Sequence, residues 1–182
     1  GVSLIDKSFV AQTYGLSSYT TCLPGSLIKK SVIEQIGGFI TRTRASYDVD
    51  FINKTKKNNI ERAINKKSIL SYFDVNYANS LLGGSKKVFS YSLNAWNAKG
   101  DFKPYIYILA FLIFISTYIF NQHYYFLFTY LLARGYIVPA IKSKSFLFIN
   151  QFSFLLTLPL IGIIIDTSRL MGYIKSYKLY GQ

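Results

Sequence analysis

The chain has 182 residues and a formal net charge of +13, with 21 Lys and Arg against 8 Asp and Glu, yet 51% of it is hydrophobic. The apolar residues are concentrated after Lys103, so a basic first part precedes an apolar second part. The single cysteine, Cys22, excludes an intrachain disulfide and the usual cysteine-based zinc sites. The first part also lacks the P-loop, GxGxxG, HExxH and GxSxG motifs, which argues against the enzyme classes that they mark.

The chain begins at Gly1 rather than at a methionine, in what reads as a loop, and we expect it to be a fragment of a longer protein. It does not open with a basic stretch, a short apolar run and a small-residue cleavage site, so no secretory signal is indicated. Membrane targeting would then come from the later apolar segments.

The first predicted helix covers 27–36, because its apolar residues recur on one helical face and its charged residues lie elsewhere. Gly37 and Gly38 follow directly and predict the end of this helix. Phe39 completes a GGF sequence at that turn.

The second predicted helix follows Ser46, whose hydroxyl can cap its first turn. Asp48 and Asp50 lie near its start and a lysine-rich run lies near its end, an arrangement that suits the helix dipole. Two residues of separation turn the side chains about 200° apart on a helix, so the two carboxylates cannot both face one cleft. Asp48 could serve as a general base, or it could only support the start of the helix.

Two more elements are predicted before the apolar part. Residues 68–73 are rich in Ile, Leu, Tyr and Phe and predict a short buried strand. Residues of about 80–98 form a basic amphipathic helix that would lie beside the membrane, with Lys86, Lys87 and Trp96 as its interfacial residues.

Three apolar segments are candidate membrane helices, at about 104–121, 124–141 and 146–165. Lysines flank the first two, and the positive-inside rule places those flanks in the cytoplasm. A full third crossing would put the basic tail outside, so the third segment could instead be re-entrant or interfacial. We therefore expect a multi-pass protein of the cell membrane, with two or three crossings and its soluble part in the cytoplasm.

The order of three sequence motifs resembles that in a known protein family. The sequence runs from PGSLIKKSVIEQIGGF through SYDVDF to NSLLGGSKKVFSYSLNAW and then into apolar spans. This order resembles the C-terminal half of a membrane-anchored family 2 glycosyltransferase. The resemblance implies that Asp48 is the base that deprotonates the acceptor hydroxyl, and that Asp50, Gly37, Gly38 and Phe39 support the acceptor side.

Two departures from the family pattern qualify this assignment. Tyr47 stands where the family usually carries Glu, which affects how the acceptor is positioned. The QxxRW sequence of processive members is missing, which favours a single-transfer enzyme over a polymerising one.

The resemblance also implies a fold and a set of partners. Residues 1–103 would be the C-terminal, acceptor-side part of an α/β catalytic domain of GT-A type, and 104–182 a membrane region with a basic tail. The enzyme would transfer a sugar, with inversion, from a nucleotide-sugar donor to a lipid-linked or cell-surface glycan acceptor, as in polysaccharide biosynthesis. A divalent metal, Mg²⁺ or Mn²⁺, would belong to the donor-binding half, which has no counterpart here and without which the fragment would be inactive.

Two other classes of function compete with this reading. A non-enzymatic membrane protein could use its basic segment to bind anionic lipid or a partner protein, and this function would not need Asp48. Nucleic-acid binding would use the net charge, but the aromatic residues are concentrated in the apolar spans and no basic-aromatic motif stands out. We therefore expect membrane lipids, and no nucleic acid, among the partners.

Overall fold

The structure is a computed structural model, and it describes residues 3–16, 26–39, 47–63, 76–93, 103–145 and 151–180. Of these described residues, 78% are helical and none lies in a strand. The expected α/β domain of GT-A type is therefore wrong, and the described fold is mostly helical. The sheet was inferred from the family resemblance and not from alternating apolar residues, whereas the apolar spacing of the described part is helical.

Some predictions fall outside the described residues. The predicted strand at 68–73, the cap residue Ser46, Cys22 and Trp96 all lie there.

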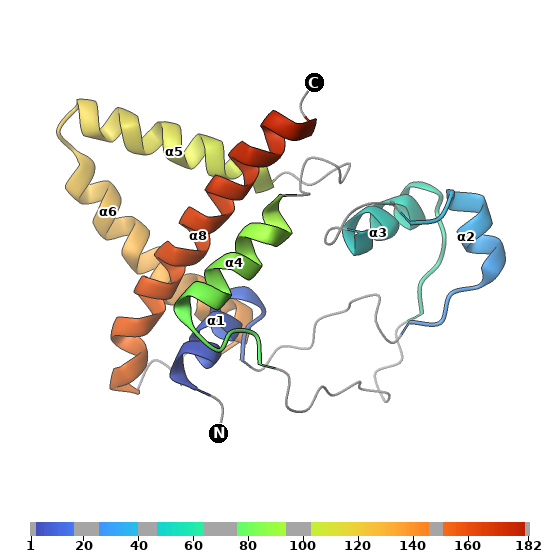
Figure 1. Cartoon of the computed structure of the whole chain (residues 1–182), viewed down its shortest axis with the longest axis horizontal. Helices are drawn as coiled ribbons and strands as arrows, with labels where there is room; N and C mark the ends of the chain where they lie inside the picture. The colour runs from blue at the N-terminus through green and yellow to red at the C-terminus, as the bar shows by residue number, and fades with distance from the viewer. Residues whose placement is uncertain are drawn as a thin grey trace.

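The described helices follow one another along the chain as α1 (Leu4–Thr13), α2 (Lys30–Ile36), α3 (Tyr47–Lys57), α4 (Leu81–Ser92), α5 (Lys103–Ile119), α6 (His123–Leu132), the π-helical segment η2 (Ala133–Ile137), α7 (Val138–Ser143) and α8 (Phe152–Tyr180). Helix α8 is the centre of the arrangement: α4 runs along it, α1 and η2 pack against it, and α5 and α6 lie on its other side (Figure 1). Figure 1 shows α2 and α3 together, on the side of α4 that faces away from α5 and α6.

Helix ends follow the local sequence closely. Gly37 adopts a left-handed conformation, with φ of 78°, and ends α2 as predicted. The Ser80 hydroxyl accepts a hydrogen bond of 3.0 Å from the backbone N–H of Gly83 and so caps α4. The loop expected at the start of the chain is wrong from Leu4 onward, because α1 begins there and Ser3 caps it through the N–H of Asp6.

The main core joins α1 and α4 to α8. Phe9, Val88, Ile161 and Ile165 are buried together, and Gly84 allows the close approach. A Cβ on Gly84 would overlap the Phe9 ring, so the glycine lets α1 and α4 meet. Gly84, although it lies within a helix, thus has a packing function.

Helix α8 is also the one described helix that is long and apolar enough to cross a membrane, over Phe152–Lys178 with 27 residues. Helix α5, in the first predicted span, is apolar but shorter, with 17 residues. The second predicted span, 124–141, is divided among α6, η2 and α7. Pro159 lies inside α8 without ending it.

Candidate functional site

The residues of the predicted catalytic motif belong to one small unit formed by α2, its terminal turn and α3. The ring of Phe39 stacks on that of Phe51, with centroids 4.6 Å apart and an interplanar angle of 19°. Phe39 also makes an edge contact with Tyr47, at 6.4 Å. Lys54 Nζ donates a hydrogen bond of 3.1 Å to the carbonyl oxygen of Gly38. The GGF turn and the acidic helix are therefore held against each other.

Asp48 and Asp50 occupy different environments on α3. Asp50 is only 4% exposed, and its Oδ2 lies 2.8 Å from Lys54 Nζ in an ion pair one helical turn away. The side chain of Asp48 is partly exposed and lies in the first turn of α3. A partly exposed carboxylate can be reached by an acceptor hydroxyl, and Asp50 forms an ion pair with Lys54.

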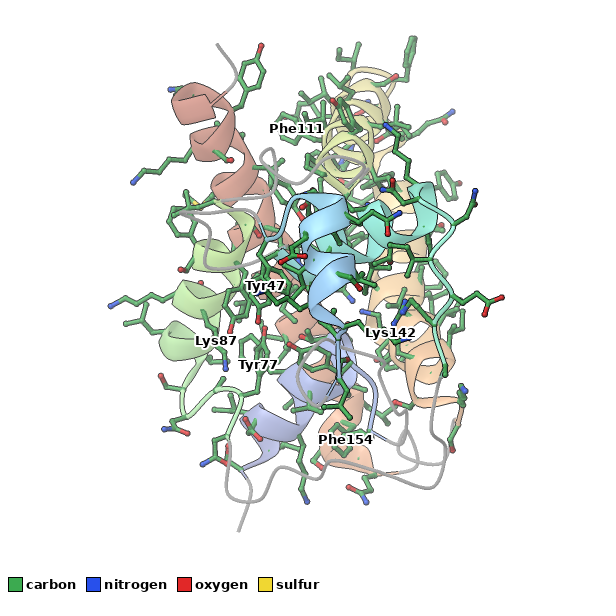
Figure 2. All side chains as sticks on the ribbon, turned by 90° about the vertical axis from the view of Figure 1, so that its right-hand side faces the viewer. Tyr47, Tyr77, Lys87, Phe111, Lys142 and Phe154 are labelled. Carbon is green, nitrogen blue, oxygen red and sulfur yellow. The ribbon has the colours of Figure 1, made fainter. Side chains whose placement is uncertain are left out.

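The predicted interfacial lysines lie on α4. Lys86 and Lys87, with Ser90 and Tyr91, line an open hollow of about 400 Å³. Lys87 Nζ donates a hydrogen bond of 3.1 Å to the carbonyl oxygen of Tyr77 and lies 4.4 Å from the centre of the Tyr77 ring. The two residues lie close together in Figure 2. The described residues that line this hollow all belong to α4, so it does not include Asp48.

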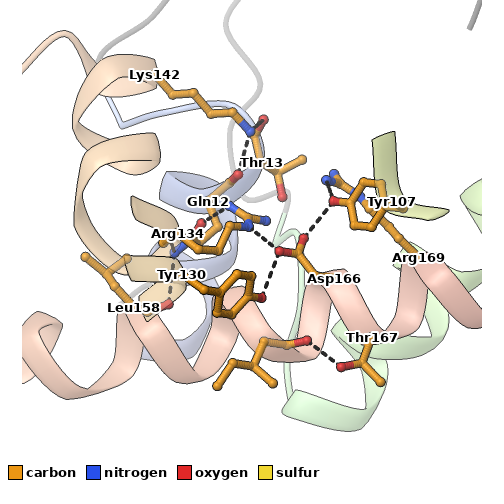
Figure 3. Close-up of polar contacts among 11 residues, drawn as sticks. Gln12, Thr13, Tyr107, Tyr130, Arg134, Lys142, Leu158, Asp166, Thr167 and Arg169 are labelled. Atoms are coloured by element: carbon orange, nitrogen blue, oxygen red, sulfur yellow. Dashed lines mark hydrogen bonds and ion pairs between the residues drawn. The ribbon is translucent and has the colours of Figure 1, made fainter. Parts of the chain in front are cut away.

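A second polar cluster surrounds Asp166, inside the helical arrangement (Figure 3). The Asp166 carboxylate accepts hydrogen bonds from Tyr107 Oη at 2.7 Å and from Tyr130 Oη at 3.0 Å. It also accepts one from Arg134 Nε at 2.7 Å, which forms a buried ion pair. These partners come from α5, α6 and η2, so the single carboxylate ties three segments to α8.

Gln12 connects this cluster to α1. Its side chain is fully buried, and Nε2 donates hydrogen bonds of 2.9 Å to the carbonyl oxygens of Arg134 and Leu158. Its Oε1 accepts a hydrogen bond from Arg134 Nη1. Because the amide is satisfied at both ends, it fixes the Arg134 side chain from the side opposite Asp166.

Two glycines let the arginine enter this position. A Cβ on Gly162 would lie 3.0 Å from Arg134 Cγ, and a Cβ on Gly135 would lie 2.8 Å from Pro159 Cγ. Side chains at either position would separate η2 from α8. The π-helical segment η2, which interrupts the helical ladder here, is a type of irregularity that recurs at functional sites.

Two further cations belong to the same region. Arg169 Nη1 donates a hydrogen bond of 2.9 Å to Tyr107 Oη. Lys142 Nζ donates to the carbonyl oxygens of Gln12 and Thr13, at 2.7 and 3.2 Å, at the C-terminal end of α1. Burial, and then the nearby Arg134 and Arg169, lower the pKa of Lys142 to about 8.

Sequence reasoning did not single out this cluster. Arg134 lies within the predicted span 124–141, Asp166 follows directly after the predicted span 146–165, and neither was predicted as a site residue. A signal was nevertheless present, because Asp166 is the sole acidic residue after Lys103 and follows a long apolar run. Ionisable residues within apolar spans are functional candidates by default.

The chain matches no protein-family model, no curated protein and no solved structure. Among the described residues, no group of three or more His, Cys, Asp or Glu side chains could hold a metal ion. No donor set on the described helices fits the divalent metal that the resemblance implies for a donor-binding half.

Proposed function

We propose that the chain is the acceptor-side, membrane-anchored part of a glycosyltransferase. It would transfer a sugar from a nucleotide-sugar donor, with inversion, to a lipid-linked or cell-surface glycan at the cytoplasmic face of the membrane. The observation that carries the proposal is the packing of the GGF turn against the acidic helix, through Phe39 on Phe51 and Lys54 on Gly38. Two of the three motifs that carry the resemblance, the GGF turn and the acidic helix, are thus neighbours in space.

The two carboxylates of α3 fit separate roles in this reaction. The partly exposed Asp48 would accept the proton of the acceptor hydroxyl. The acceptor oxygen would then form a bond to the anomeric carbon as the bond from that carbon to the nucleoside diphosphate breaks. Asp50 is bound to Lys54 and would hold the helix against the turn.

The apolar surface supports the membrane part of the proposal. Helix α8 has the length and composition of a membrane-crossing helix. Helix α5 exposes much of its apolar surface. Its large hydrophobic residues that are more than half exposed are Tyr105, Ile106, Leu109, Leu112, Tyr118 and Ile119. A contiguous apolar surface of this kind is rare on proteins that face only water.

Asp48→Asn tests the catalytic assignment. Membranes from cells that express the protein from its native locus are incubated with radiolabelled nucleotide-sugars, and label in the lipid and glycan fractions is counted. We expect Asp48→Asn to reduce transfer by about 100-fold or more, because general-base catalysis contributes about 10²–10⁴-fold. Membrane insertion should be unchanged, because Asp48 lies on α3 and not on α8. Asp50→Asn should reduce transfer less.

Glu34→Gln is the matched control, since it makes the same carboxylate-to-amide change on the neighbouring helix α2. Glu34 is well exposed and forms only a surface ion pair with Lys30, at 3.7 Å. Its substitution should leave transfer within about twofold, because surface pairs contribute little. Unchanged transfer in Asp48→Asn would refute the assignment of the base and would favour the non-enzymatic membrane protein.

A further inference from the structure

The cluster around Asp166 carries more positive than negative charge. Arg134, Arg169 and Lys142 are three cations in this region, and Asp166 pairs with Arg134 alone, whereas Arg169 bonds to Tyr107 and Lys142 to the carbonyl oxygens of Gln12 and Thr13. Both oxygens of Asp166 already accept hydrogen bonds, and one of these comes from Arg134. One carboxylate can neutralise one cation, so two positive charges remain in a largely apolar part of the molecule. Uncompensated charge in such surroundings is costly.

Arg134 also has an unsatisfied donor. The residue is only 9% exposed, and its Nη2 is buried without a hydrogen-bond partner. Its Nε and Nη1 are directed to Asp166 and Gln12, which fixes the plane of the guanidinium. Buried donors in folded proteins nearly always have a partner, so this nitrogen indicates that an acceptor belongs beside it.

The three cations come from separate segments and surround the same place. Figure 3 shows Lys142 of α7, Arg134 of η2 and Arg169 of α8 around the end of α1 and the middle of α8. Arg169 and Lys142 are partly exposed, whereas Arg134 is buried. Lys103, at the start of α5, is close enough to lower the pKa of Lys142 as well.

This arrangement selects one class of ligand. Guanidinium groups match phosphate oxygens in geometry, and a lysine adds a compact positive charge. Two excess positive charges match a phosphate monoester or a diphosphate better than a phosphodiester, which carries a single negative charge. We propose that Arg134, Arg169 and Lys142 form a binding site for a phosphate monoester or diphosphate group. This site does not depend on Asp48 or on glycosyl transfer.

Calorimetric titration of the full chain in detergent micelles tests the site. The probes are phosphatidic acid, which has a phosphomonoester headgroup, phosphatidylglycerol, which has a phosphodiester, and inorganic phosphate. The two lipids are compared at equal micelle surface charge. We expect phosphatidic acid to bind about tenfold more tightly than phosphatidylglycerol, a difference of the size that one added charge-assisted hydrogen bond supplies.

Two variants of α8 that remove the same charge distinguish binding at this site from nonspecific electrostatic binding to the basic chain. Arg169→Gln should weaken phosphatidic acid binding about tenfold, because it removes a guanidinium from the site. Lys178→Gln removes the same charge near the end of α8, outside the cluster, and should change binding less than about twofold. Because Arg134 is buried, Arg134→Lys serves as a second variant, and circular dichroism verifies that it folds.

The soluble probe identifies the source of the phosphate. If inorganic phosphate competes with phosphatidic acid, the site recognises the anion itself. If phosphatidic acid binds and inorganic phosphate does not, the ligand is a lipid headgroup. Both results support the site. It is overturned if phosphatidic acid does not bind, if phosphatidylglycerol binds equally well, or if Lys178→Gln weakens binding as much as Arg169→Gln.

Discussion

Asp166→Asn removes the one carboxylate of the polar cluster with almost no change in side-chain volume. Arg134 would then remain buried and charged, without the partner that lies 2.7 Å from its Nε. Breaking a buried ion pair by removing one partner costs about 3–5 kcal/mol. The hydroxyls of Tyr107 and Tyr130 would also lose a charged acceptor, so we expect the upper part of that range.

The effect can be measured as the loss of far-UV circular dichroism on heating in detergent micelles. For a chain of this size, the melting temperature changes by roughly 2–4 °C per kcal/mol, so Asp166→Asn should lower it by about 10 °C or more. Thr167→Val is the adjacent control, since Thr167 is exposed and bonds only to the carbonyl oxygen of Ile163. It should change the free energy of unfolding by less than about 0.5 kcal/mol.

A double variant isolates the ion pair from other effects of the substitution. In Asp166→Asn/Arg134→Gln neither member of this ion pair is left charged without the other, so part of the stability should return. The coupling energy between the two positions should exceed about 1 kcal/mol, as for residues in one buried network. Additive effects, or a loss below about 1 kcal/mol in Asp166→Asn, would refute the view that this pair holds α8 to η2.

Two more predictions concern packing and pH. Gly84→Ala should destabilise the protein by about 1–3 kcal/mol in chemical unfolding, because its Cβ would overlap Phe9. The exposed Gly83→Ala should be neutral or stabilising by up to about 1 kcal/mol, and equal effects would contradict the proposed contact. The pKa of Lys142 falls from 10.5 to about 8 on folding. Between these values the unfolded chain binds the extra proton, so stability should rise with pH in that window, and Lys142→Met should flatten the rise. An unchanged slope in Lys142→Met would place the titration elsewhere.

The sequence predicted the features that depend on residues close together in the chain, such as helix ends and the charges along one helix. The acidic start and basic end of α3 and the glycine stop after α2 are visible in the sequence, and the structure has both. The predicted helix at about 80–98 is present in its described part, Leu81–Ser92, and Ser80 caps it. Helix α1 was missed because its apolar residues do not follow a clear helical face. The burial of the polar residue Gln12 in this helix is explained only by its hydrogen bond to Arg134, which lies far away in the sequence.

The polar cluster depends on contacts between distant positions, which a single sequence does not show. Arg134 and Asp166 are 32 residues apart, and Gln12 and Arg134 are 122 apart. The charges themselves are visible in the sequence, but their meeting in space is not. The error in fold class has another origin, since the sheet came from the family resemblance and not from a strand pattern in the residues that the structure describes.

The proposed inverting transfer of a sugar is tested most directly by following a labelled sugar into its product. Membranes that contain the protein are incubated with nucleotide-sugars labelled at the anomeric carbon, and the configuration of the product is read by NMR. We expect a product of inverted configuration that disappears when the chain is deleted from its locus and does not return with Asp48→Asn. A product with retained configuration, or equal transfer with and without the chain, would contradict this proposal.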